Sequence, residues 1–432
     1  MSAASSSSAE QLLARAMAAN VEAAEVYELR TSAHTACFEA NHLKRLEHLE
    51  SGGMALRVWN QHRPGLAVAH GPFDQDTLVA QAIALSELHP PQDYPLSASV
   101  MQPAQLDRGL AVPAEQLIRW GHDSIDRILD AHADCSCSAE YECETEYVHL
   151  INSAGMECRY TDITLRGLLT AEKIKGQDFL CIEADQVQRN QLNPEALIEL
   201  IEQRLAWAAE RVPAPQGAVP VLFTPRAADT LWATLQAALN AQKIIEGVSP
   251  WSDRLGASVI SPQLTLSQIP SLGPYSCPFD DEGQATQTLE LVHQGELQLF
   301  YTDLRTGQLL GSGTTGNGFR PTLNQYPHPE LINLVVQPGS KSFSEIIGAL
   351  SDGILVDQVL GDNSRIGGDL SINVDLGYRI RQGKITGRVK DVMISGNTYQ
   401  ALQQVLMLGN DHQWNNIFYS PSILVGGLSV TA

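Results

Sequence analysis

The chain has 432 residues, and 49 Asp or Glu against 28 Lys or Arg give it a formal net charge of −21 at pH 7. Such a surface repels nucleic-acid phosphates, and the sequence contains no basic run to offset it, so we expect no direct nucleic-acid binding. No stretch approaches the roughly 20 apolar residues that span a bilayer, and Met1–Ser8 lacks the pattern of a signal peptide. Seven scattered cysteines are typical of reduced thiols. These features predict a cytoplasmic protein without a membrane partner.

The N-terminal half mixes helical and strand patterns. Apolar residues at helical spacing, with capping residues before them, predict helices after Ser7, from Asp74 or Asp76 to Leu88, over Ala114–Ala133, and from Asn193-Pro194. Alternating apolar runs predict strands between Ala24 and Ala69, a hairpin over Tyr141–Thr170 around Asn152–Gly155, and a short strand over Phe179–Ile182.

The segment Val212–Pro220 has three prolines and one glycine in nine residues, which is typical of a linker. We therefore predict two domains, residues 1–211 and 212–432. The second begins with a strand at Val221–Phe223 and a helix over Arg226–Ile245, and is otherwise mostly strand and turn. Its clearest later helix has a Ser342–Glu345 capping box and Gly353 as a C-terminal cap. The fold class is α+β, with a mixed α/β N-terminal domain and a strand-rich C-terminal domain.

Several motifs follow one another in the second half. They are the acidic turn Pro278–Gly283, a hairpin around His293-Gln294-Gly295-Glu296, the glycine cluster Gly311–Gly318, the segment Gly367–Ser371, and the final Ser420–Val430. In this order and spacing they resemble the TldD/PmbA family, and within it the PmbA (TldE) branch. The resemblance is strong from Phe279 to Val430 and weaker from Glu25 to Thr170.

The glycine cluster also matches a dinucleotide fingerprint at Gly311-x-Gly313-x-x-Gly316. A nucleotide site needs a strand before the glycines and a helix after them, whose N-terminus meets the pyrophosphate. Phe319-Arg320-Pro321 follows instead, and it cannot open a long helix. A glycine-rich turn is the better interpretation.

Three groups of residues suggest metal or acid–base chemistry, and for two of them we favour a structural explanation. Cys135, Cys137 and Cys143, near His132, have the spacing of strand residues on one face, so we favour buried apolar packing over zinc. Asp280, Asp281 and Glu282 suit a divalent ion or paired carboxylates, but turns select such residues for backbone reasons, so we favour solvated turn residues. The same ambiguity holds for Asp369 and Ser371.

A recognisable catalytic centre is missing from the sequence. None of the twelve histidines is followed by glutamate, none has a second histidine four or five positions on, and no G-x-S-x-G elbow occurs. We therefore assign no catalytic and no metal-binding residue.

The resemblance implies how such a chain contributes. In this family a TldD-type subunit pairs with a TldE-type subunit, and the TldD-type subunit holds zinc with an HExxxH helix and a later cysteine and cuts peptides in a central cavity. Here the corresponding helix is Arg226–Ile245, with Leu235, Gln236, Ala238 and Asn240 on its face, and no cysteine follows Cys277 near Gly409–Asp411. The resemblance thus implies a non-catalytic subunit without a cofactor of its own, the zinc belonging to a TldD-type partner.

Two alternatives stay open. One is a non-enzymatic binding or regulatory protein that acts alone or as a homodimer on DNA gyrase or a toxin–antitoxin pair. The other is an enzyme with a metal site built from Asp280, Asp281, Glu282 or Asp411.

For the subunit hypothesis we expect particular residues to line a peptide cavity, because glycines let a foreign backbone approach closely. They are Asp280, Asp281, Glu282, Gly283, Gly313, Gly316, Asp369 and Ser371. The competing explanation is that the glycines only provide tight turns with positive φ.

Overall fold

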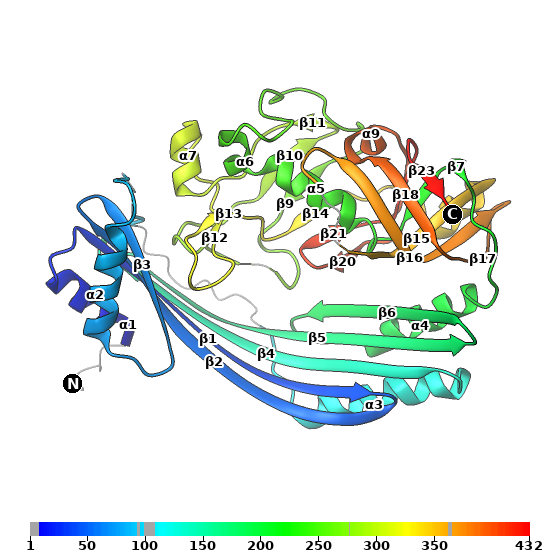
Figure 1. Ribbon diagram of the computed structural model, residues 1–432, viewed down its shortest axis with the longest axis horizontal. Helices are drawn as coiled ribbons and strands as arrows, with labels where there is room; N and C mark the ends of the chain where they lie inside the picture. The colour runs from blue at the N-terminus through cyan, green and yellow to red at the C-terminus, as the bar shows by residue number, and fades with distance from the viewer. Residues whose placement is uncertain (1–7, 93–95, 99–108, 276, 362–364) are drawn as a thin grey trace.

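The structure is a computed structural model that describes residues 8–92, 96–98, 109–275, 277–361 and 365–432. A long, strongly curved sheet from the N-terminal half runs along one side of the molecule, and the C-terminal half lies over its concave side (Figure 1). Both chain halves contain helices and strands, and strands dominate the second half. The predicted α+β class is confirmed.

The N-terminal sheet has six antiparallel strands in the order β3-β2-β1-β4-β5-β6. Their bounds are β1 Ala23–Glu39, β2 His42–Asn60, β3 Arg63–His70, β4 Ser136–Asn152, β5 Glu157–Lys175 and β6 Asp178–Gln188. Short turns join β1 to β2, β2 to β3, β4 to β5 and β5 to β6, and the first two turns use residues with positive φ, such as Asn41 and His62. The predicted hairpin around Asn152–Gly155 is the β4–β5 connection.

Four helices cover the other face of this sheet. They are α1 Ser8–Ala18, α2 Gln75–Ser86, α3 Ala114–Ala131 and α4 Pro194–Trp207. Asp74 caps α2 by accepting from the Thr77 amide, and Asn193 caps α4 by accepting from the Ala196 amide, as the sequence predicts. Leu117 of α3 and Ile201 of α4 are fully buried in one core with Tyr141 of β4, while α1 and α2 bury a separate core against β1–β3.

The C-terminal half contains two large sheets. One has the order β11-β10-β9-β14-β21-β20, the other β19-β22-β8-β15-β16-β18-β23-β7 with β17 paired to β16, and β12 pairs with β13. The strand bounds are β7 Gly217–Ala218, β8 Val221–Phe223, β9 Leu266–Gln268, β10 Leu289–His293, β11 Glu296–Leu297, β12 Gly318–Phe319, β13 His328–Pro329, β14 Leu334–Val336, β15 Asp352–Leu360, β16 Asp369–Arg381, β17 Lys384–Val389, β18 Val392–Asn397, β19 Val405–Leu408, β20 Gln413–Asn415, β21 Phe418–Ser420, β22 Ile423–Val425 and β23 Ser429–Thr431.

Helices complete this half and its core. They are α5 Asp229–Leu239, α6 Ala241–Ile245, α7 Leu304–Leu310, α8 Phe343–Ala349 and α9 Thr398–Gln403. Leu231 and Leu235 of α5 are fully buried in a core shared by strands of both large sheets. The predicted hairpin is confirmed as β10–β11, whose turn has Gln294 and Gly295 at φ 44° and 82°.

Two local predictions are wrong. The helix predicted over Arg226–Ile245 is two helices, because Asn240 adopts an extended conformation between them. The Ser342–Glu345 capping box is present at the start of α8, but that helix ends at Ala349 and Gly353 lies inside β15. The amide of Leu350 closes the last turn instead, so no glycine is needed there.

The two halves of the chain share buried surface. Leu205 of α4 lies in one core with Leu355 of β15 and Tyr378 of β16, and the Tyr378 hydroxyl donates to the Arg204 carbonyl at 3.2 Å. The division into residues 1–211 and 212–432 remains a prediction. No helix among the described residues is long and apolar enough to cross a membrane.

Candidate functional site

The helix to which the resemblance assigns the zinc ligands of the TldD-type subunit ends early in this chain. After Leu239, Asn240 takes φ −73° and ψ 120°, which stops the helical hydrogen-bond ladder. Its side-chain oxygen accepts from the Gln242 amide at 2.8 Å and so caps α6, and its Nδ2 donates to the Pro329 carbonyl at 2.7 Å. Both ends of the Asn240 side chain are therefore committed to the backbone.

The neighbouring side chains are committed as well. Leu235 is fully buried in the apolar core, and Gln236 Nε2 donates to Glu330 Oε2 at 3.2 Å. Burial raises the pKa of Glu330, and the nearby His328 opposes this shift. Alkyl and amide groups are not zinc ligands of the kind that proteins use, and no group of three His, Cys, Asp or Glu in the described part of the chain is arranged to hold a metal ion.

The acidic turn is buried, so the expectation of solvated turn residues is wrong. Asp280 and Glu282 are 0% and 1% exposed. Asp280 Oδ1 accepts from the amides of Glu282 and Gln284 at 3.0 and 2.8 Å, and its Oδ2 accepts from the Gly318 amide at 2.8 Å. Burial and the neighbouring Glu282 carboxylate raise the pKa of Asp280, while these backbone donors lower it. The Asp280 carboxylate therefore stabilises the turn by accepting hydrogen bonds from three backbone amides.

The glycine cluster packs against this turn. Helix α7 precedes it, and Gly311 ends that helix at φ 69°, so the order of elements is the reverse of a dinucleotide site. Glu282 Oε2 accepts from the Leu304 amide at 2.8 Å in the first turn of α7. A β-carbon on Gly316, which has φ +71°, would overlap the Ala285 carbonyl, whereas one on Gly313, at φ +75°, would meet no atom within 4 Å. Positive φ thus accounts for both glycines, and their role in a peptide cavity remains a prediction.

Asp369, Ser371 and Asp411 lie away from the acidic turn. Asp369 and Ser371 are on the exposed face of β16, paired with Asn397 and Ser395 of β18. Gly283 packs instead against the β4–β5 hairpin, where a β-carbon would overlap the Met156 side chain. Asp411 accepts from the amide and the hydroxyl of Ser422 at 3.0 and 2.6 Å. The structure therefore brings Asp280–Gly283 together with the Gly316–Gly318 end of the cluster, and places Asp369, Ser371 and Asp411 on other strands and loops.

The three cysteines belong to the core. Cys135, Cys137 and Cys143 are at most 5% exposed and pack between the sheet and its helices, so the interpretation as buried apolar residues is confirmed. Burial raises the pKa of all three thiols, that of Cys137 to about 12.

A buried ion network connects the acidic turn to the N-terminal sheet. Arg320 donates to Glu25 of β1 at 2.9 Å, and its amide donates to Asp281 at 2.8 Å. Arg57 of β2 donates to the same Glu25 carboxylate at 3.0 Å. The Arg320 guanidinium lies 4.6 Å from the centre of the Tyr27 ring. These charges, distant in sequence, fix the relative position of the two chain halves at this point.

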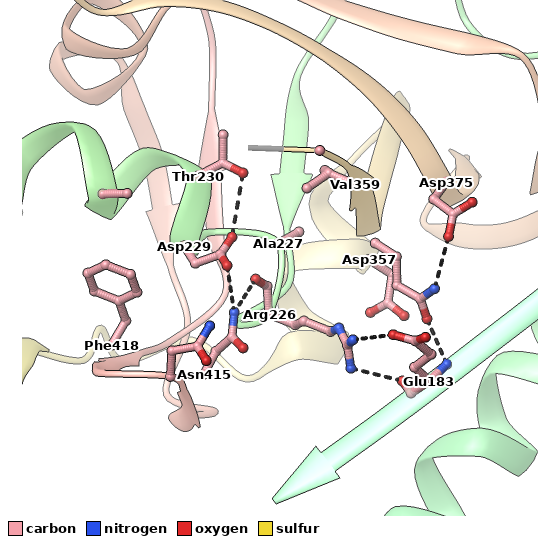
Figure 2. Close-up of a pocket in the computed structure, with 14 residues that line it drawn as sticks. Glu183, Arg226, Ala227, Asp229, Thr230, Asp357, Val359, Asp375, Asn415 and Phe418 are labelled. Carbon is pink, nitrogen blue, oxygen red and sulfur yellow. Dashed lines mark hydrogen bonds and ion pairs between the residues drawn. The ribbon is translucent and has the colours of Figure 1, made fainter. Parts of the chain in front are cut away.

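A polar cavity of about 400 Å³ lies where β8 leads into α5. Figure 2 shows the Arg226 side chain reaching from this connection to Glu183 of β6, while Asn415 lies between Asp229 and the Arg226 carbonyl. Arg226 donates to Glu183 Oε2 at 2.7 Å and to Asp185 at 2.8 Å, and Asn415 donates to Asp229 at 3.0 Å. The carboxylates of Glu183, Asp229, Asp357 and Asp375 line the cavity. Two of them are already paired, Glu183 with Arg226 and Asp357 with Arg204.

No motif in the sequence predicts this cavity. Its charged residues come from β6, the β8–α5 connection, α5, β15 and β16, and no short motif links them. Among these residues, Asp357 is the one that the sequence could have indicated, because it interrupts an apolar strand. In the structure its residue is only 2% exposed. Its carboxylate is paired with Arg204 of α4 at 3.0 Å, which again joins the two halves.

Similarity to known proteins shows the family of this chain. The family model described as the PmbA/TldA metallopeptidase C-terminal domain matches residues 216–432. The chain belongs to the PmbA/TldD family. A metalloprotease from Archaeoglobus fulgidus is 30% identical over 170 residues, which cover 39% of this chain and 40% of that protein. A metalloprotease from Methanothermobacter thermautotrophicus is 29% identical over 204 residues, 46% of this chain and 44% of that protein. The matches thus span less than half the length of these two relatives.

Solved structures match the PmbA/TldD chain over almost its full length. TldE from Thermococcus kodakarensis superimposes with a TM-score of 0.90 at 21% identity, covering 98% of this chain and 99% of that one. A proposed modulator of a DNA gyrase from Thermotoga maritima superimposes with a TM-score of 0.87 at 20% identity, covering 98% of both chains. The fold is therefore the one seen in TldE.

Proposed function

We propose that this PmbA/TldD protein is a TldE-like, non-catalytic subunit of a cytoplasmic zinc metallopeptidase complex that degrades or processes peptides. In this proposal the zinc and the chemistry belong to a TldD-type partner, and this chain shapes the substrate cavity and supports the partner. Direct binding to nucleic acid is not part of the function, because the net charge of −21 opposes it.

The main support for this proposal is the segment of α5 and α6, where the resemblance places the zinc ligands of a TldD-type subunit. Leu235 is a core residue, Gln236 is bonded to Glu330, and Asn240 ends the helix and caps the next. A zinc peptidase whose ligands lie on a helix needs two ligands and a glutamate on one uninterrupted face of that helix. The full-length similarity to the fold of TldE supports the same assignment.

The alternative is a binding protein that acts alone or as a homodimer. The similarity to a proposed modulator of a DNA gyrase is its support, although a fold does not determine a function. Such a protein would act by contacting other proteins, since its charge opposes contact with DNA phosphates.

Zinc content tests the proposal on the chain by itself. Purified after expression in zinc-supplemented medium, the isolated protein should contain far less than about one zinc per chain, because α5 and α6 contain no His, Cys or Glu. Elemental analysis after gel filtration gives the molar ratio of zinc to protein. A stoichiometric zinc that a chelator removes together with peptidase activity would contradict the non-catalytic assignment.

A further inference from the structure

One edge of the N-terminal sheet is open along part of β2. Strand β1 pairs with β2 over its whole length, whereas β3 pairs only with residues 53–60 of β2. Among the described residues no strand pairs with the outer side of residues 42–52, and all of residues 42–51 are exposed. In Figure 1 β2 runs along the lower border of the curved sheet and extends well beyond β3. We refer to residues 42–52 as the open edge of β2.

Backbone groups of the open edge point away from the sheet. The Gly52 carbonyl accepts from the Gly71 amide at 3.4 Å, so it faces outward. This orientation alternates along a regular strand, and the pairing of β2 with β1 is regular over residues 45–59. Further amides and carbonyls therefore face outward, those of Leu46, His48 and Glu50. Such a row of backbone donors and acceptors can pair with another strand.

The opposite edge of the same sheet, strand β6, is closed by side chains of the C-terminal half. Gln358 accepts from the Glu183 amide at 2.9 Å, and Arg226 donates to the Glu183 carbonyl at 3.2 Å. Arg388 donates to the Phe179 carbonyl at 3.1 Å. The backbone groups of β6 thus have partners within the chain, which distinguishes this edge from the open edge of β2.

Large apolar side chains are exposed on the open edge. Leu43, Leu46 and Leu49 are 37%, 50% and 66% exposed. A bulge between Leu43 and Arg45 disturbs only the start of the strand, and the open edge contains no proline. A long edge with exposed apolar residues and without proline is typical of a surface that associates with another strand.

The order of charges makes the open edge complementary to itself. Lys44 and Arg45 precede Leu46, and Glu47 and Glu50 follow it. An antiparallel second copy would place the basic part of one edge against the acidic part of the other, whereas a parallel copy would place like charges together. With the two Leu46 residues opposite one another, Arg45 of each copy lies opposite Glu47 of the other. Such self-complementarity is what a two-fold symmetric interface requires.

We propose that two copies of this chain pair through their open β2 edges, antiparallel and about a two-fold axis at Leu46. The pairing joins the two N-terminal sheets into one continuous sheet. This inference goes beyond the proposed function, because it concerns two copies of this chain and involves no zinc subunit.

The oligomeric state of the isolated, full-length chain tests the pairing. Sedimentation velocity over a range of protein concentrations should show a monomer–dimer equilibrium. Leu46→Lys should raise the dissociation constant of the dimer by about tenfold or more, because two ammonium groups would face each other at the axis. Its melting temperature should stay near that of the wild type, since the Leu46 side chain is exposed.

The matched control is Leu88→Lys, which should leave the dissociation constant unchanged. Leu88 is 77% exposed. It follows Glu87, whose carbonyl accepts from Arg63 at 3.2 Å, so it lies near the opposite end of β2.

A charge exchange tests the orientation and register of the two strands. Arg45→Glu places carboxylates of the two copies opposite each other and should raise the dissociation constant by about threefold or more. Adding Glu47→Arg to this variant restores opposite charges and should return the dissociation constant to near the wild-type value. Raising the salt concentration should weaken the wild-type dimer.

Three results would overturn the proposal: a wild-type chain that stays monomeric at the highest soluble concentration, a dimer that Leu46→Lys does not weaken, or a charge exchange that does not restore the dimer. If the wild-type chain is monomeric but Leu46→Lys releases a co-expressed zinc subunit, the open edge belongs to that subunit and the self-pairing is wrong. Dimerisation of the isolated chain is independent of the proposed function, because these sedimentation measurements involve no zinc subunit.

Discussion

Replacing Arg320 with methionine should lower the free energy of unfolding by about 3–5 kcal/mol, the usual cost of removing one partner from a buried ion pair. Methionine keeps much of the side-chain volume but removes the charge that compensates two carboxylates. The Arg320 side chain is 2% exposed, as is that of Glu25, to which it donates. Denaturant-induced unfolding, followed by tryptophan fluorescence, measures this change in the free energy of unfolding.

The loss should also depend on pH with a defined sign. Burial raises the pKa of Asp281, and Arg320 opposes that shift, so the variant should have a still higher Asp281 pKa. A carboxyl group whose pKa is raised by folding stabilises the protein less as the pH rises from its unfolded pKa to its folded pKa. The deficit of Arg320→Met should therefore be smaller at pH 5 than at pH 8.

An exposed ion pair provides the control for Arg320→Met. Arg15 and Asp76 form one with side chains 50% and 73% exposed, and Arg15→Met should leave the unfolding midpoint nearly unchanged. Equal, small effects of the two substitutions would show that the buried network does not hold the chain halves together.

Substituting alanine for Gly316 should destabilise the protein severely, whereas the same change at Gly313 should cost about 1–2 kcal/mol. Both glycines have positive φ, and an L-residue in that region costs about 1–2 kcal/mol. Only at Gly316 does the new β-carbon also overlap backbone, at Ala285, and backbone that anchors a buried turn cannot easily move. Melting temperatures of the two variants make the comparison.

The two glycines serve as each other's control, since the residue type and the sign of φ are the same. Equal melting temperatures would contradict the packing of the cluster against the acidic turn. If Gly313→Ala folds normally, its effect on peptide cleavage by a reconstituted complex tests the predicted cavity role without the complication of misfolding.

Local signals in the sequence predicted much of the fold. Asn193 and Asp74 cap helices because their side chains accept hydrogen bonds from amides three residues further along the chain. Gly295 turns a hairpin because its own φ is positive. Each of these effects depends on residues close in the chain, so these caps and turns could be predicted from the sequence. The short helices α7 and α9 were not predicted.

Features that depend on distant partners were not predictable in this way. Asp280 and Glu282 have the composition of a solvated turn, yet they are buried because amides of Gly318 and Leu304 meet them. The break at Asn240 follows from the Pro329 carbonyl and the start of α6, not from a proline or glycine. The cavity around Arg226 is lined by residues of six helices and strands, β6, α5, β15, β16, β20 and β21. No residue spacing along the chain predicts it.

The proposed division of labour between two subunits is tested most directly by co-expressing this chain with a TldD-type chain and purifying through a tag on this chain only. We predict that the zinc-bearing chain co-purifies, that zinc amounts to about one ion per pair, and that peptide cleavage requires the partner's zinc ligands. Retained zinc and peptide cleavage by this chain in the absence of any partner would contradict the account.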